Sequence, residues 1–491
     1  MKKNLIITII FIFLICFGLW LRFRGIIAGS FAFTYDTGRD LLAVRDLIYQ
    51  KKISLLGPTT GQMGIFYGPW WYWFLTMPFL IFQGNPTDIA AFIGFLGVVA
   101  VALAWIWGSK YYDVYFGLSL AGILALAPFF VSVTSQIWSP DLLALGTLLV
   151  IILLARLPKL GKRGLVMFGF LLALLTEMEI VYGLIWGLAI LIALFLWQRK
   201  ILFSAKTLWL ILGVTLVELP RFIFEIRHGF GQTKAFLMAL GAWGSATFHF
   251  ERLWLWLDNI LVVAPGNSWF WRFSLAAAVA IILLLGWRHF PVKQKILVAQ
   301  LLTIITVFGL VTLGYPKDFW HYYLFGLPVV SAVLVALVFS QMARFLSGKV
   351  ALTLLGVYLL LLLKPGEFLG SLKNPSFVGD AAVYRNQLAV IDDIYRQAGG
   401  ENFNYIAYTP PQIDYTWRYL FWWRSQTKYN FGPVIPRQGK YFVIIEPDPG
   451  YPQRIIDWLK VRENDGVLLG EKTFPSGIRL QLRRRTPEQN L

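Results

Sequence analysis

The first forty residues, MKKNLIITIIFIFLICFGLWLRFRGIIAGSFAFTYDTGRD (Met1–Asp40), join a long apolar run to a short charged motif. As a helix, such a run crosses a hydrocarbon layer of about 30 Å. Arg22 and Arg24 follow it where a cleaved signal peptide would carry small residues, so we expect an uncleaved first membrane span. The motif YDTGRD then begins directly outside the predicted membrane.

The composition is that of a polytopic membrane protein. Of 491 residues, 57% are hydrophobic and only 14% are charged, so a water-soluble globule would not bury its apolar surface. The formal net charge of +18 is here a signal of topology and not of nucleic-acid binding, because cytoplasmic loops collect Lys and Arg. The lone Cys16 excludes an intrachain disulfide framework and a cysteine-based metal site.

About eleven apolar runs long enough to span a membrane follow one another between Asn4 and Lys364. With Lys2 and Lys3 inside, every second connection is basic and is predicted to be cytoplasmic. The basic residues of these connections are Lys110; Arg156, Lys159, Lys162 and Arg163; Arg199, Lys200 and Lys206; Arg288, Lys293 and Lys295; and Arg344 and Lys349. The predicted extracytoplasmic connections are Gly29–Asp88, Gln136–Asp141, Thr176–Tyr182, Pro220–Trp271 and Gly314–Tyr323.

We divide the chain into a transmembrane domain, 1–365, and an extracytoplasmic α/β domain, 366–491. The first outer loop, 29–88, contains two predicted helices lying in the membrane surface: one carries Leu41, Val44, Leu47 and Ile48 at helical spacing, and the other is GPWWYWFLTMPFLIFQG (68–84). In the α/β domain, KYFVIIEPD, GVLLGEKTF and IRLQLRRR are predicted strands, and Tyr384–Ala398 and Gln453–Val461 are predicted helices. We expect Asn374–Leu491 to position the acceptor or cover the site without doing chemistry.

Asp36 is the first candidate for catalysis. A carboxylate at a boundary between water and lipid is suited to accept a proton from a hydroxyl or to bind a cation. The alternative is structural: Asp36 caps its helix, and Asp40 pairs with Arg39 or Lys51.

Two further carboxylates are predicted on the same side of the membrane. Asp141 stands at the entry to the fourth span, although Ser139-Pro140-Asp141 is also a good helix start. Glu177 and Glu179 lie at the outer end of the fifth span. Residues two apart face different sides of a helix, so at most one of these two glutamates is expected to point into a shared cavity.

Cations and hydrogen-bond donors also gather at the outer ends of spans, where they could hold a phosphate group as it leaves; the alternative for each is an anchor that contacts lipid headgroups. The candidates for binding a donor phosphate are Arg39, Arg221, Arg227, Lys317, His321 and Tyr323.

Cofactor motifs are missing from the sequence. No zinc-type His spacing, P-loop, dinucleotide fingerprint or G-x-S-x-G motif occurs, so ATP-driven chemistry and an elbow-type serine hydrolase have no support. No cofactor is required by the sequence. A divalent cation, Mg²⁺ or Mn²⁺, is an open alternative, because Asp36 with Asp141 or Glu179 offers oxygen ligands.

These motifs resemble those of the GT-C membrane glycosyltransferases that use polyprenyl-phosphate sugars, both in their order along the chain and in the side of the membrane on which they are predicted to lie. This group includes protein O-mannosyltransferases and aminoarabinose transferases. The matching features are Asp36 before an interfacial helix, GPWWYW (68–73) in place of HPPLYYW or KPxxxYW, Asp141 before the fourth span, and HYYLFGLP (321–328) in place of RYLLPLxP. The chain departs from the pattern at Thr37, where many relatives carry Glu, and at Tyr67 or Gly68, where relatives often carry His or Lys.

The resemblance implies a hexosyl- or pentosyltransferase of the multi-pass plasma membrane. A polyprenyl phosphate would deliver the sugar with its tail in a lipid-facing groove, and the acceptor would be an envelope glycan, lipid or protein. Asp36 would take the proton of the acceptor hydroxyl while that hydroxyl attacks and inverts the anomeric carbon, with Asp141 and Glu179 as further candidate catalytic residues. Basic residues would hold the departing phosphate.

Three other functions stay open at this stage. A transporter or flippase of lipid-linked glycans would need polar residues along a path through the midplane, whereas here the charges gather at the ends of spans. A polymerase of lipid-linked glycans would use the same outer-leaflet chemistry. If the protein had a structural or receptor-like role, the clustering of charges at the outer ends of the spans would be accidental.

Overall fold

The structure, a computed structural model, describes residues 2–62, 64–241, 248–373, 380–410, 413–434 and 440–484. The chain forms two compact units, each built from several segments. The membrane unit comprises Met1–Phe23, Ile53–Phe74 and Phe92–Leu369. The α/β unit comprises Arg24–Lys52, Leu75–Ala91 and Gly370–Leu491.

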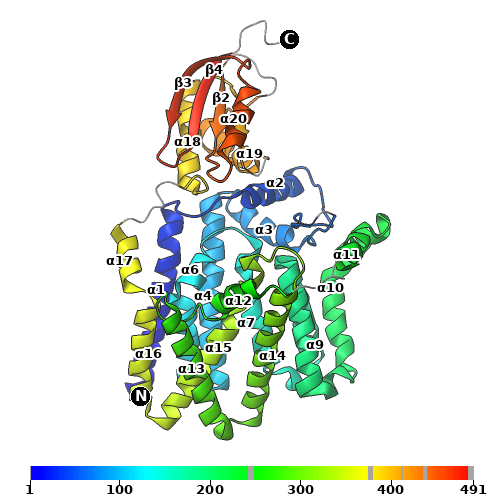
Figure 1. The fold of residues 1–491 in the computed structure, drawn as a ribbon, viewed down its shortest axis with the longest axis vertical. Helices are drawn as coiled ribbons and strands as arrows, with labels where there is room; N and C mark the ends of the chain where they lie inside the picture. Colours follow the sequence, from blue (N-terminus) through cyan, green and yellow to red (C-terminus); the bar gives the residue numbers. More distant parts are fainter. Residues whose placement is uncertain are drawn as a thin grey trace. The chain divides into compact units, whose positions relative to one another are not determined.

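The described part of the membrane unit is a bundle of helices (Figure 1). Seven helical segments in the described residues are long and apolar enough to cross a membrane. They contain α1 (Lys2–Ile27), α4 (Pro86–Tyr111), α9 (Ile180–Leu202), α10 (Lys206–Arg227), α13 (Trp269–Gly286), α14 (Val292–Gly314) and α15 (Pro328–Phe345). The chain is therefore a multi-pass integral membrane protein, as predicted.

Shorter helices complete the bundle. Three of them are apolar: α5 (Val114–Leu126), α7 (Leu143–Leu154) and α16 (Gly348–Leu362). Together with α8 (Lys162–Met178) and the seven long helices, they correspond to the predicted spans, about eleven in number. The connecting helices are α6 (Pro128–Ser132), η1 (Ser139–Leu142), η2 (Leu157–Lys159), α11 (Gly231–Gly241), η4 (Phe250–Arg252), α12 (Leu253–Ile260), η5 (Trp287–His289), η6 (His321–Leu324) and α17 (Pro365–Lys373).

Side-chain contacts between connections agree with the predicted alternation. At one end, the Tyr67 hydroxyl donates to Glu179 and the Trp138 ring packs against Tyr322, so four predicted outer segments meet. At the other end, Lys206 Nζ donates to the Pro158 carbonyl at 2.8 Å, which joins two of the basic connections. The connections predicted to be outer and the basic connections predicted to be cytoplasmic thus meet at different ends of the helices.

The orientation itself is a prediction. A reporter that is active only outside the cytoplasm should be active when fused after Gly366 and silent when fused after Lys162, because basic connections are retained inside. Activity measured for the two fusions in intact cells tests this, and the reverse pattern would place the candidate site in the cytoplasm.

A four-stranded sheet in the order β1-β2-β4-β3 forms the centre of the α/β unit (Figure 1). Its strands are β1 (Asn404–Tyr408), β2 (Lys440–Ile445), β3 (Val467–Thr473) and β4 (Arg479–Arg484). β1 and β2 are parallel, and the other two pairs are antiparallel. The three predicted strands are confirmed, although Arg485, the end of the third, lies outside the described residues.

Helices pack beside this sheet. The predicted helices are confirmed as α18 (Tyr384–Ala398) and α20 (Pro452–Lys460), whereas β1, α19 (Tyr415–Arg424) and η7 (Ser425–Tyr429) were not predicted. Ile455, Trp458 and Leu459 of α20 pack against the buried residues Tyr408, Tyr441, Val443 and Ile445 of β1 and β2. Burial of this apolar face holds α20 on the sheet.

The two helices predicted in the first outer loop are also present, as α2 (Tyr35–Tyr49) and α3 (Trp70–Ile81). Leu41 and Val44 of α2 are buried. Gly38 permits a close approach to α19, since a Cβ on Gly38 would lie 2.6 Å from the Thr416 nitrogen. The apolar face of α2 therefore packs against protein, and its place in the membrane surface stays a prediction.

Candidate active site

A cavity of about 300 Å³ lies where the predicted outer connections of the membrane unit meet. Its walls come from the loop that precedes α3, the start of α9, α11, the end of α14 with its following loop, and η6. Apolar side chains line it together with these polar residues: Thr60, Gln62, Tyr67, Glu179, Tyr315, Lys317, Tyr322 and Tyr323. An apolar cavity with a few convergent polar groups is the usual form of a small-molecule site.

Glu179 is the only described carboxylate that lines this cavity. α8 ends at Met178, and Glu179 adopts an extended backbone (φ −156°, ψ 112°) before α9 begins. Its side chain caps α9 by accepting from the Val181 amide, and its other oxygen accepts from the Tyr67 hydroxyl at 2.8 Å. Glu179 is only 2% exposed, so this acid is held in one orientation. Glu177 does not line the cavity, in agreement with the prediction that at most one of the two would.

Tyr67 faces Glu179 as a hydrogen-bond donor. Burial raises the pKa of the Tyr67 hydroxyl well above its ordinary value, and the negative charge of Glu179 raises it further. The pKa of Tyr315 is raised by the same two causes, burial first. Both phenols therefore stay protonated at neutral pH and can donate to an anion.

Lys317 supplies a cation to the cavity. Its Nζ donates to Gln62 Oε1 at 2.6 Å, and its carbonyl accepts from Arg252 Nη2 at 2.7 Å. Arg252 also donates to the Tyr315 carbonyl, so it holds the loop that carries both residues. Arg252 was missed in the sequence, because a single arginine between aromatic residues resembles a headgroup anchor.

The buried Glu177 and the half-buried Arg221 form an ion pair beside the loop that carries Tyr67. Arg221 Nη2 lies 2.5 Å from Glu177 Oε1, and Arg221 Nη1 lies 2.9 Å from Glu218 Oε2. The Glu177 carboxylate lies against Gly68, where a Cβ would clash with it. This contact ties the start of α3 to α8 and α10. Arg221 does not line the cavity, and its role toward a phosphate stays a prediction.

Asp141 lies in a different place from Glu179, within the same unit. It is 1% exposed, its Oδ1 accepts from Gln136 Nε2 at 3.2 Å, and it begins α7 through η1, as Ser139-Pro140 predicts. A small cavity is lined by both Asp141 and Arg22. Arg22 is buried and donates to Thr134 and to carbonyls that include Leu124, so a buried cation and a buried carboxylate share this site.

Asp36 and Arg39 belong to the α/β unit. Thr34 is the N-cap of α2, so the alternative that Asp36 caps the helix is wrong. Asp36 lies in the first turn, and its Oδ1 is 2.8 Å from Arg39 Nη1. Arg39 also contacts Asp40 Oδ1 at 2.8 Å, which confirms the expected Arg39–Asp40 pair. The proposed roles of Asp36 and Arg39 in catalysis stay predictions.

The remaining candidates are His321 and Arg227, both exposed. His321 begins η6, and its ring packs edge-on against Tyr322 and Phe325. Arg227 ends α10. Tyr323, two residues after His321, is the candidate of this segment that lines the cavity.

Within the described ranges, no group of three or more His, Cys, Asp or Glu side chains could hold a metal ion. A role for Mg²⁺ or Mn²⁺ stays a prediction.

Comparison with known proteins relates this architecture to solved structures. No protein-family model matches the sequence, and no curated protein matches it. ArnT from Cupriavidus metallidurans in the apo state superimposes with a TM-score of 0.62 at 11% identity, covering 96% of this chain and 97% of that chain. The chain has the GT-C fold of ArnT.

A second ArnT structure, bound to undecaprenyl phosphate, gives a TM-score of 0.60 at 10% identity, over 96% of this chain and 97% of that chain. Because both comparisons extend over nearly the full length, they include the α/β part as well as the spans. The fold predicted from the motifs is therefore confirmed.

Proposed function

We propose that the protein is a membrane glycosyltransferase that moves a sugar from a polyprenyl phosphate to an acceptor hydroxyl on the extracytoplasmic face. The observation that carries this proposal is the cavity of about 300 Å³, in which Glu179, Lys317 and four tyrosines converge at the ends of apolar helices. The ArnT fold supports it, since one ArnT structure holds undecaprenyl phosphate.

The cavity fits a sugar phosphate that is attached to lipid. Lys317 and the phenols of Tyr315 and Tyr323 offer donors to phosphate oxygens, and charge-assisted hydrogen bonds of this kind are the stronger ones. The Tyr67 hydroxyl donates to Glu179. As the bond from the anomeric carbon to the phosphate oxygen breaks, the phosphate gains charge. Donors that already point into the cavity stabilise that charge without reorganisation.

An apolar groove on the same unit fits the prenyl tail. Its volume is about 470 Å³, and it is lined by Trp70, Trp73 and Phe74 together with apolar side chains of α7 and α8. Trp70 follows Tyr67 by three residues, so the segment 67–70 contributes to both the groove and the polar cavity. A lipid with a polar head and an apolar tail would use both.

In this proposal, the acceptor hydroxyl attacks the anomeric carbon from the face opposite the phosphate, and the configuration inverts. Asp36 takes the hydroxyl proton as the general base, and the electron pair of the broken bond leaves with the polyprenyl phosphate. Glu179 orients the sugar as a hydrogen-bond acceptor in the cavity, and Asp141 is a further candidate catalytic residue. The acceptor is a glycan, lipid or protein of the cell envelope.

The decisive experiment incubates the purified full-length protein with polyprenyl phosphates that carry a pentose or a hexose, together with envelope extracts as acceptor. We expect release of free polyprenyl phosphate and a product of inverted anomeric configuration, detected by mass spectrometry and NMR. Movement of the intact lipid-linked sugar across vesicles, with no release of polyprenyl phosphate from any donor, would favour a flippase instead.

Lys317→Ala should weaken donor binding. Loss of one hydrogen bond to a charged group corresponds to about 1.5–3 kcal/mol, or roughly 10–100-fold in the KM for donor. Lys295→Ala, which removes the same charge from a predicted cytoplasmic connection, is the matched control and should leave this KM unchanged. An unchanged KM in Lys317→Ala would show that Lys317 does not bind the donor and serves only as the hydrogen-bond partner of Gln62.

A further inference from the structure

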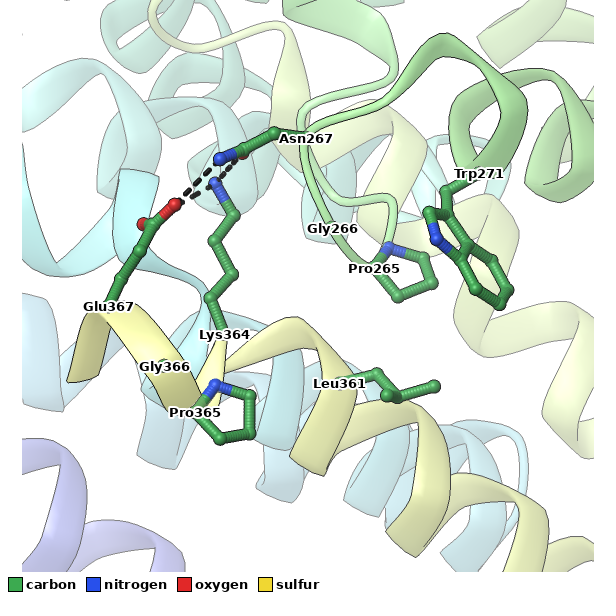
Figure 2. A pocket seen from close by; sticks show the side chains of 9 residues that line it. All are labelled: Pro265, Gly266, Asn267, Trp271, Leu361, Lys364, Pro365, Gly366 and Glu367. Carbon is green, nitrogen blue, oxygen red and sulfur yellow. Dashed lines mark hydrogen bonds and ion pairs between the residues drawn. The ribbon is translucent and has the colours of Figure 1, made fainter. Parts of the chain in front are cut away.

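A second pocket, of about 310 Å³, opens where the connection before α13 meets the end of α16 (Figure 2). Trp271, Pro265 and Pro365 form apolar walls, and Asn267, Lys364 and Glu367 supply the polar groups. None of these residues lines the candidate active site. The pocket therefore needs a separate explanation.

The three polar side chains form one connected network. Asn267 Nδ2 donates to Glu367 Oε1 at 2.6 Å, Lys364 Nζ donates to Asn267 Oδ1, and Lys364 Nζ lies 4.0 Å from Glu367 Oε2 (Figure 2). A cation and an anion thus stand near each other, and both bond to one amide side chain. Such a pair presents no net charge but a defined dipole.

The backbone around the network is held in an unfavourable conformation. Lys364 has φ +51°, a left-handed conformation that is disfavoured for a residue with a Cβ. On the facing segment, Gly266 has φ +78°, and a Cβ there would lie 3.0 Å from the Trp271 ring. The Tyr358 hydroxyl donates to the Val263 carbonyl at 2.6 Å and joins the two segments. Strain of this kind persists where the surroundings hold it, often at binding sites.

The pocket lies at the ends of predicted membrane spans. α13 begins at Trp269 and α16 ends at Leu362, so the pocket is at the ends of two apolar helices. Trp254, Phe270 and Trp271 of the same region are exposed. Exposed tryptophans at the ends of spans are typical of the membrane interface.

We propose that this pocket binds the headgroup of a zwitterionic phospholipid, phosphatidylethanolamine. Its phosphate would lie on the Lys364 ammonium and its own ammonium on the Glu367 carboxylate, antiparallel to the Lys364–Glu367 dipole. Leu361, Pro365 and Trp271 would contact the glycerol and the first carbons of the acyl chains.

Charge and hydrogen bonding decide between lipid classes. An anionic headgroup has no positive group to place on Glu367. A choline headgroup has the right charges but no N–H to donate to this carboxylate, whereas an ethanolamine ammonium donates three hydrogen bonds. Hydrogen bonds to a charged group favour ethanolamine by roughly 10-fold or more.

Native mass spectrometry of the full-length protein, released from micelles that contain equal amounts of phosphatidylethanolamine, phosphatidylcholine and phosphatidylglycerol, tests the proposal. We expect one phosphatidylethanolamine to be retained about 10-fold over phosphatidylcholine. Glu367→Gln should lower ethanolamine retention to the choline level, and Lys364→Gln should lower both. Glu251→Gln removes an exposed acid that does not line this pocket and should leave retention unchanged.

Thermal unfolding of each variant identifies any variant that does not fold. The lipid retention of the remaining two variants then decides whether the proposal holds. Equal retention of the three lipids, a preference for phosphatidylglycerol, or an unchanged preference in Glu367→Gln would overturn the proposal. Sugar transfer is not needed for this readout, so the result is independent of the proposed enzymatic function.

Discussion

Asp36→Asn should lower the rate of sugar transfer by about 10²–10⁴-fold, the usual contribution of a general base. The fold should tolerate the change for two reasons. The Asp36 side chain is 38% exposed, and Thr34, not Asp36, caps α2. The pair with Arg39 is partly open to solvent, and a pair of this kind contributes about 0–1 kcal/mol. Asp36→Asn should therefore lose transfer activity while its thermal stability changes little.

Asp40→Asn is the matched control on the same helix turn. Asp40 is 2% exposed, and its Oδ1 accepts from Arg39 Nε at 2.9 Å. We expect this variant to lose stability, because a buried carboxylate that binds a guanidinium is replaced, while donor turnover per folded molecule changes little. Transfer rate and thermal unfolding are measured for both variants side by side. Near-normal transfer in Asp36→Asn would end its assignment as the base and direct attention to Glu179 and Asp141.

Arg221→Met should lower the free energy of unfolding by about 3–5 kcal/mol, since it leaves the fully buried Glu177 without its cation. The loss should extend to function, because Glu177 lies against Gly68, one residue after Tyr67. The double variant Glu177→Gln/Arg221→Met removes both charges and should recover part of the lost stability.

Arg227→Met, an exposed arginine that ends the same helix, is the control and should change stability by less than about 0.5 kcal/mol. Denaturant unfolding in detergent measures all four proteins. Donor affinity, measured below the unfolding transition, tests the separate prediction that Arg221 binds phosphate. Unchanged stability with a large loss of donor affinity in Arg221→Met would make Arg221 a phosphate ligand instead of a structural partner of Glu177.

Hydropathy and loop charge were sufficient to predict the bundle. Membrane insertion depends on apolar character summed over about 20 consecutive residues, which is a local property of the chain. The same reasoning explains why the segments α2 and α3 and the three strands β2, β3 and β4 could be located in advance. β1 was missed because NYIAY (404–408) is a short run of ordinary strand propensity that is stabilised by its pairing with β2, more than thirty residues later.

The partners of the charged residues required the tertiary structure. Glu177 and Glu179 are nearly adjacent, yet the extended backbone at Glu179 turns one toward Tyr67 and leaves the other with Arg221. Arg22 looked like the flank of a first span, but it bonds to carbonyls more than 100 residues away. Sequence alone determined which residues enter the membrane and where charges gather, because both follow from transfer free energies of short segments. Only the packed helices decided which charges pair and which face a cavity, since those contacts join residues that are distant in the chain.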